Sequence, residues 1–324
     1  MIRDQAFWKD QPACFSRVIE DVWGALQPST TEKYCLTLRN FFHFSLLNSS
    51  EVKLPVGPIV SASFLVFLRE RGYSKFSIKL GLVSLKWVNS FFPEASKLDD
   101  PFLSRIVASA TRNCLSAKNQ KVPLSQEIIR KILSRVSNLS LLQTRDALIM
   151  ALSFSLLLRN DELRHLCCSH IEERTEGLVF NIVSSKTDVF RGGKKLFLAR
   201  NSGDYCVVNL LKKYLLMARL EIGANSFVFG PISRDARGHF INGKFQLSYA
   251  SCLAIFKRQL AAQKVNPLAF GTHSARSGGA TALARKVTPF ELMLSGRWAD
   301  ARSLRNYVEV PEKRRFEISR NISL

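Results

Sequence analysis

The stretch GTHSARSGGATALARKVTPFELMLSGRWADARSLRNYVE, residues 271–309, carries the motifs that decide the fold prediction. His273 and Arg276 lie three residues apart, a spacing that places both side chains on one face of a helix. Gly278 and Gly279 follow and let that helix approach another backbone closely. Two donors on one helix face suit a phosphate that gains charge during a reaction. Taken alone, the motif is equally compatible with a capping histidine beside a surface arginine.

Further helices are expected around this motif, because apolar residues recur there at helical spacing. One of them begins with Thr288, Pro289 and Glu291, which supply an N-cap, a first-turn proline and a capping box. We expect Gly296 to end it. The helices expected in this region cover residues 206–222, 248–263, 273–285, 289–295 and 302–308.

A second motif, LLLRNDELRHL, occupies residues 156–166. Arg159 follows a long apolar run that predicts a buried helix, and Asn160 or Asp161 is expected to cap the next helix. Glu162 stands one turn away from Arg159. An arginine held by a carboxylate is preorganised to bind a phosphate through two hydrogen bonds, although such a pair taken alone is more often a purely structural salt bridge.

Two short runs between these motifs have the composition of strands. GLVFNIV at 177–183 and KKLFLAR at 194–200 are rich in β-branched and aromatic residues and flank a loop with two glycines, which predicts a small antiparallel sheet. Lys186 lies in that loop, where a flexible amine can reach a ligand, although most turn lysines have no function. Tyr307 follows Trp298 by nine residues, and both would ordinarily be packing aromatics.

The charge balance indicates the kind of partner. The chain has 324 residues, a length typical of two domains, with 47 Lys and Arg against 26 Asp and Glu, a net charge of +21. Residues 1–120 hold 15 basic and 10 acidic residues, a net +5, which leaves +16 for residues 121–324. An excess of this size favours a polyanionic partner, above all a nucleic acid.

Other classes of protein fit less well. The longest apolar run, Ala147 to Leu158, has twelve residues, whereas a membrane span needs about 20. The charged start MIRDQAFWKD is unlike a signal peptide, so we expect an intracellular protein that stays with DNA. The cysteines form no C-x-x-C pair, and the cluster at 165–170 lacks metal-ligand spacing. We therefore expect reduced thiols and no metal site.

The first part of the chain has the pattern of a helical domain. Ser29 and Glu32 have capping-box spacing, which predicts a helix start there, and further helices are expected over 74–91 and 101–115. Basic side chains in this part are either a solvated face or contacts to DNA phosphates, and the overall charge favours the second. The candidate DNA-binding residues are Lys75, Lys79, Lys86, Arg112, Lys118 and Lys121.

Taken together, the motifs resemble the catalytic set of the tyrosine recombinase, or phage integrase, family. The resemblance rests on the order and spacing of the candidates and covers the chain from about residue 29 onward. Trp298 is assigned the place of the usual histidine, because Tyr307 lies nine residues downstream. The residues that carry the resemblance are Arg159, Glu162, Lys186, His273, Arg276, Trp298 and Tyr307.

This resemblance implies metal-independent cutting and rejoining of DNA, with no cofactor. Tyr307 would attack a backbone phosphate to form a 3′-phosphotyrosine and release a 5′-hydroxyl. Arg159, Arg276 and His273 would bind the non-bridging oxygens, and Lys186 would protonate the leaving oxygen. By the same resemblance, Glu162 would orient Arg159, and Trp298 would pack and donate through its indole N–H.

The resemblance also implies an architecture. We expect a mainly α, two-domain clamp on double-stranded DNA, with a helical core-binding domain at 1–115 and a linker at 116–123. A catalytic domain at 124–310 would combine α and β structure with a small antiparallel sheet. A homo-tetramer on two DNA sites is the implied working form. The tail at 311–324 is either frayed or, as we favour, docked on a neighbouring protomer.

Three functions remain open at this point. The first is a site-specific recombinase, such as an integrase or the transposase of a mobile element. The second is a type IB topoisomerase, which shares the chemistry, although the short chain and its helical first part argue against it. The third is a catalytically inactive, recombinase-derived DNA-binding protein, against which the complete set of candidate residues argues.

Overall fold

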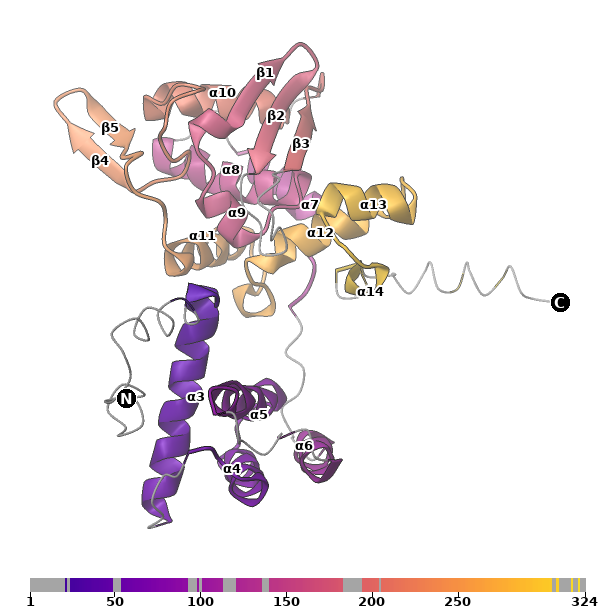
Figure 1. Cartoon of the computed structure of the whole chain (residues 1–324). Helices are drawn as coiled ribbons and strands as arrows, with labels where there is room; N and C mark the ends of the chain where they lie inside the picture. The colour runs from indigo at the N-terminus through magenta and orange to yellow at the C-terminus, as the bar shows by residue number, and fades with distance from the viewer. Residues whose placement is uncertain are drawn as a thin grey trace. The chain divides into compact units, whose positions relative to one another are not determined.

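The computed structural model describes Asp21, residues 24–48, 54–92, 98, 101–112, 121–135, 140–182, 194–203 and 205–304, together with Tyr307, Val308, Phe316 and Arg320. The chain divides into two compact units, Met1–Asn119 and Gln120–Leu324. Most described residues lie in helices, and a small antiparallel sheet lies in the second unit (Figure 1). The prediction of a mainly α protein with such a sheet is therefore confirmed.

The first unit is a group of helices around an aromatic core. The Phe64 ring lies 5.2 Å from that of Phe41 and 5.7 Å from that of Phe44, and all three are buried. The predicted start at Ser29 is wrong: the helix begins at Pro28, whose fixed φ suits the first helical position. The helix expected over 74–91 is present as Lys75–Asn89, with Ser74 as its N-cap. The helices are α3 (Pro28–Leu47), α4 (Pro58–Glu70), α5 (Lys75–Asn89) and α6 (Pro101–Arg112).

The second unit is built around α8, which contacts the helices α7, α9, α10, α11 and α12. Every residue from Ala147 to Phe154 is buried, as expected for a helix that is apolar on all sides. The helices of this unit are α7 (Gln126–Leu133), α8 (Leu141–Ser155), α9 (Asn160–Arg164), α10 (Val207–Ala218), α11 (Tyr249–Ala262), α12 (His273–Leu283), α13 (Pro289–Gly296) and α14 (Ala301–Leu304), with short 3-10 turns at Cys168–His170 and Pro267–Ala269.

The two predicted strands are present and pair antiparallel. A third strand, which the sequence pattern did not predict, pairs with the first of them, and a separate hairpin was also missed. Gly177 opens the middle strand with φ 156°, and a Cβ there would lie 2.1 Å from the Leu198 carbonyl oxygen. The strands are β1 (Ile171–Arg174), β2 (Gly177–Ile182) and β3 (Lys194–Ala199) in the order β1-β2-β3, and β4 (Ile232–Asp235) with β5 (Gly238–Ile241).

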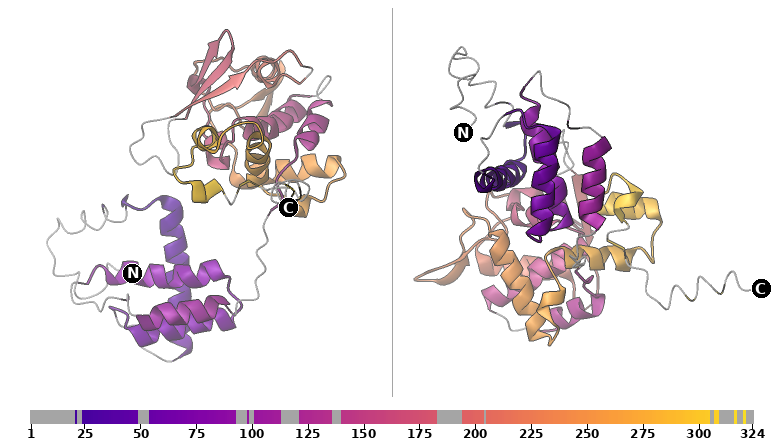
Figure 2. Two further views of the ribbon diagram at one scale, coloured as in Figure 1. Left: turned by 90° about the vertical axis from the view of Figure 1, so that its right-hand side faces the viewer. Right: turned by 90° about the horizontal axis from the view of Figure 1, so that it is seen from below.

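The close helix approach predicted at the glycine pair is observed. A Cβ on Gly278 would lie 1.8 Å from the Leu124 carbonyl oxygen, and one on Gly279 would lie 2.1 Å from that of Phe154. Helix α12 therefore lies directly on the segment before α7 and on the end of α8. Helices α12, α13 and α14 follow one another in contact (Figure 2).

Candidate active site

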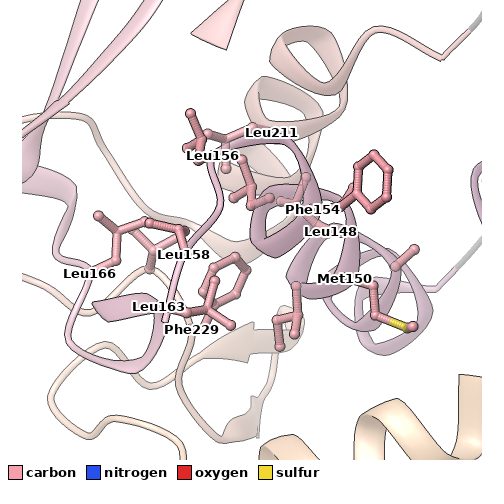
Figure 3. Close-up of a cluster of buried hydrophobic side chains, with 14 of the residues drawn as sticks. Leu148, Met150, Phe154, Leu156, Leu158, Leu163, Leu166, Leu211 and Phe229 are labelled. Atoms are coloured by element: carbon pink, nitrogen blue, oxygen red, sulfur yellow. The ribbon is translucent and has the colours of Figure 1, made fainter. Parts of the chain in front are cut away.

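The site begins where α8 ends and the chain turns into α9. Leu156, Leu158 and Leu163 anchor this turn in the core of the second unit (Figure 3). Between them, Leu157 adopts φ 50°, a left-handed conformation that few residues with a Cβ adopt. The buried leucines hold Arg159, which follows them, in a defined place.

The prediction that Asn160 or Asp161 caps α9 is wrong. Arg159 itself stands at the N-cap, and its backbone N–H donates to Glu162 Oε2 at 2.8 Å. Arg159 Nη1 also donates to Glu162 Oε1 at 2.7 Å. The Glu162 side chain is 2% exposed and that of Arg159 18%, so a buried carboxylate holds a guanidinium that still reaches the surface.

Arg276 lies on α12 and is completely buried. Its Nη1 donates to the Leu157 carbonyl, and its Nη2 donates to the Gly296 carbonyl at 2.5 Å. Burial, together with the charges of Arg159 and Arg297, lowers the pKa of Arg276 to about 10, which leaves it charged at neutral pH. Arg276 therefore joins the α8–α9 turn to the end of α13.

Two aromatic rings cover this guanidinium. Arg276 Cζ lies 4.5 Å from the centroid of the Trp298 ring and 5.2 Å from that of Tyr307, and the two rings lie 5.1 Å apart. The Thr281 hydroxyl donates to the Tyr307 carbonyl at 3.3 Å. The expected helix over 302–308 is wrong in extent: α14 ends at Leu304, and Tyr307 follows in a turn. Tyr307 is thus held by its ring and its backbone.

Arg297 belongs to the same cluster, and the sequence analysis missed it. Its Nη2 donates to Glu162 Oε2 at 2.6 Å and to the Leu157 carbonyl at 2.9 Å. Gly296 does not end α13 as predicted, because the left-handed residue that does so is Arg297, with φ 58°. A Cβ on Gly296 would lie 1.7 Å from the Trp298 ring, so this glycine provides space instead. The only signal in the sequence was a charged residue next to Trp298.

The cluster has excess positive charge and unused donors. Three guanidinium groups, on Arg159, Arg276 and Arg297, surround the single carboxylate of Glu162. Among the described residues, the buried N–H groups Arg276 Nε and Trp298 Nε1 have no hydrogen-bond partner. A buried donor without a partner is costly, and an anionic oxygen would satisfy it. The site therefore has the chemistry of a phosphate-binding site.

The other predicted residues are exposed or half-buried, or lie outside the described residues. His273 is exposed at the start of α12, one turn before Arg276. Lys75 and Lys79 are exposed on α5. Lys121 is exposed, and its Nζ donates to the Leu268 carbonyl at 2.8 Å. The remaining candidates are Lys86, half-buried on α5, Arg112, exposed at the end of α6, and Lys118 and Lys186, which lie outside the described residues.

In the part of the chain that the structure describes, no three His, Cys, Asp or Glu side chains are grouped so that they could hold a metal ion. None of the described helices combines the length and the apolar character that a membrane span requires.

No family model and no curated protein sequence matches the chain, but solved structures share its fold. The XerH site-specific recombinase bound to difH substrate matches with a TM-score of 0.60 and 17% identity over 89% of this chain and 78% of its own. The Tn1549 transposon integrase in complex with transposon right end DNA matches with a TM-score of 0.63 and 15% identity over 94% and 99%. A lambda integrase dimer bound to a COC' core site matches with a TM-score of 0.57 and 14% identity over 88% and 89%. The chain therefore has the fold of the tyrosine recombinases, the family that its motifs resemble.

Proposed function

We propose that the chain is a site-specific tyrosine recombinase that cuts and rejoins double-stranded DNA through a 3′-phosphotyrosine intermediate. The observation that carries the proposal is the buried Arg276 guanidinium, which contacts the ring of Tyr307 and shares the Leu157 carbonyl with Arg297. Arginines with unused donors beside a tyrosine combine a nucleophile with groups that stabilise a charged phosphate. The recombinases and integrases of this fold named above were solved with DNA.

In the proposed reaction, the Tyr307 hydroxyl oxygen attacks a backbone phosphorus, and the bond from that phosphorus to the 5′-oxygen breaks. His273 accepts the tyrosine proton, and Lys186 gives a proton to the departing 5′-oxygen. Arg159 and Arg276 bind the non-bridging oxygens, where charge builds up in the transition state. The phosphotyrosine bond conserves the energy needed to join a new strand.

The number of nucleophiles in each protomer determines how many protomers the proposed reaction needs. A protomer carries one Tyr307, and exchange between two duplexes needs four strand cuts, so we propose a tetramer on two sites. The tail at 311–324 would dock on a neighbouring protomer of this tetramer. Transposition of a mobile element is one reaction that such an enzyme could carry out.

A nicked substrate tests the proposed function. Duplexes taken from the DNA that flanks the gene, with a nick placed so that the released fragment diffuses away, should trap the wild-type protein in a complex that survives denaturant. An inactive DNA-binding relative would retard the same DNA on a native gel and leave no such complex, which would refute the proposal.

Substitution of the bridging 5′-oxygen tests whether Lys186 is the acid that protonates it. Sulfur at the 5′ position is a better leaving group that needs no proton, so cleavage by Lys186→Ala should recover on a 5′-bridging phosphorothioate. Cleavage by Arg159→Ala should recover far less, because Arg159 acts on other oxygens. Cleavage rates on the two substrates give the comparison. Equal recovery of both variants would assign the acid to another residue, with Lys194 and Lys195 next to be tested.

A further inference from the structure

Arg297 adopts a backbone conformation that its residue type disfavours. It ends α13 with φ 58° and ψ 44°, in the left-handed region where glycine is most at ease. Arg219 ends α10 in the same way, with φ 58° and ψ 45°, and its guanidinium pairs with the exposed Asp235. Arg297 differs from Arg219 in that its side chain is almost completely buried.

The buried guanidinium of Arg297 is bound on both of its terminal nitrogens. Nη1 donates to the carbonyls of Leu156 and Ser295, at 3.3 and 3.2 Å. Nη2 donates to the Leu157 carbonyl and to Glu162 Oε2. These acceptors come from the α8–α9 turn, from α9 and from α13, so one side chain fastens three parts of the site together.

Glu162 divides its two oxygens between two arginines. Oε1 accepts from Arg159 Nη1, while Oε2 accepts from Arg297 Nη2 and from the Arg159 backbone N–H. The Arg297 carbonyl in turn accepts from Arg159 Nη2 at 3.4 Å. Arg159 is therefore held both by Glu162 and by the main chain of Arg297.

We propose that Arg297 is a positioning residue for strand cleavage, which fixes Glu162 so that Glu162 and the Arg297 carbonyl aim Arg159 at the phosphate. This inference rests on the proposed function. The terminal nitrogens of Arg297 bond to Glu162 and to main-chain carbonyls, so its effect is transmitted through Glu162 and through the Leu157 carbonyl that it shares with Arg276.

The ionisation of Glu162 gives this role a measurable signature. Burial raises the pKa of the Glu162 carboxyl, but the charge of Arg297, and then the backbone N–H and charge of Arg159, outweigh burial and leave the pKa below its ordinary value. Arg276 is the third charged group that faces Glu162. Without Arg297 the pKa of Glu162 should rise. Protonated Glu162 would release Arg159, so cleavage should be lost at a higher pH than in the wild type.

Arg297→Gly is the most informative variant, because glycine accepts the left-handed conformation. On saturating nicked DNA, the single-turnover cleavage rate should fall about 10- to 100-fold, as for other groups that orient a functional side chain. DNA affinity should stay close to that of the wild type, and the acid limb of the pH–rate profile should move to higher pH. Arg219→Gly relieves the same backbone conformation and removes an ion pair elsewhere, so it should cleave like the wild type.

Arg297→Gln carries a neutral side chain that is also long and polar, and it should show the same slower cleavage and the same shift of the acid limb. It replaces the glycine variant in the test if that variant does not fold. A folded variant of either kind that cleaves at the wild-type rate with an unchanged pH profile would overturn the positioning role. So would a loss confined to DNA affinity. Failure of the wild type itself to form a covalent complex would instead refute the proposed function.

Discussion

Replacing Tyr307 with phenylalanine should abolish the covalent protein–DNA complex while folding and DNA affinity survive. The change removes the hydroxyl only, so the ring keeps its contacts with Trp298 and Arg276, and the backbone bond from Thr281 is untouched. Loss of a nucleophile removes the chemical step, and cleavage should fall by about 10³-fold or more. Denaturing gels of the nicked-substrate reaction measure the complex, and native gels measure binding.

A control variant separates the hydroxyl of Tyr307 from tyrosine hydroxyls in general. Tyr205 is an exposed tyrosine of the same unit, and Tyr205→Phe should form the complex at the wild-type rate. If Tyr307→Phe still formed a denaturant-resistant complex, another residue would be the nucleophile.

Gly278→Ala should destabilise the second unit by about 3 kcal/mol, near the upper end of the costs measured for overpacked cores. The new methyl group would meet backbone atoms of Leu124, with the oxygen at 1.8 Å, and no rotamer change can relieve a clash with backbone. The Leu124 N–H donates to the Ser274 carbonyl at 2.8 Å, so the segment cannot move away without losing that bond.

Chemical denaturation followed by circular dichroism gives the free energy of unfolding. Gly203→Ala is the matched control, because a Cβ at this exposed glycine would make only an ordinary contact of 3.7 Å with Asn201. Its stability should stay within about 0.5 kcal/mol of the wild type, as for most surface substitutions. Equal stability of the two variants would contradict the close approach of α12 to the segment before α7.

The parts of the fold that local signals determine could be predicted. Thr288 caps the helix that follows and forms the expected capping box, and the helix expected from residue 74 begins at Lys75. The strand β1 was missed because its sequence, IEER, is mostly polar and lacks the alternation of apolar and polar residues that marks a strand. Helix α10 ends four residues before expected, at the left-handed Arg219, where no glycine marks the end.

The candidate site likewise has one part that could be predicted from the sequence and another part that could not. Arg159 and Glu162 are three residues apart, so their pairing could be suggested from spacing alone. The role of Arg297 depends on a left-handed backbone and on Glu162, which lies 135 residues earlier in the chain. A partner so distant in sequence leaves no periodic signal, and only the three-dimensional arrangement brings it to the site.

Mass spectrometry of the trapped complex tests most directly whether Tyr307 becomes covalently joined to DNA. After digestion with protease and nuclease, the peptide that contains Tyr307 should carry the mass of the remaining nucleotides, and fragmentation should place them on the tyrosine oxygen. Nucleotides attached to any other residue would contradict the account. So would a protein that binds its site but yields no peptide that carries nucleotides.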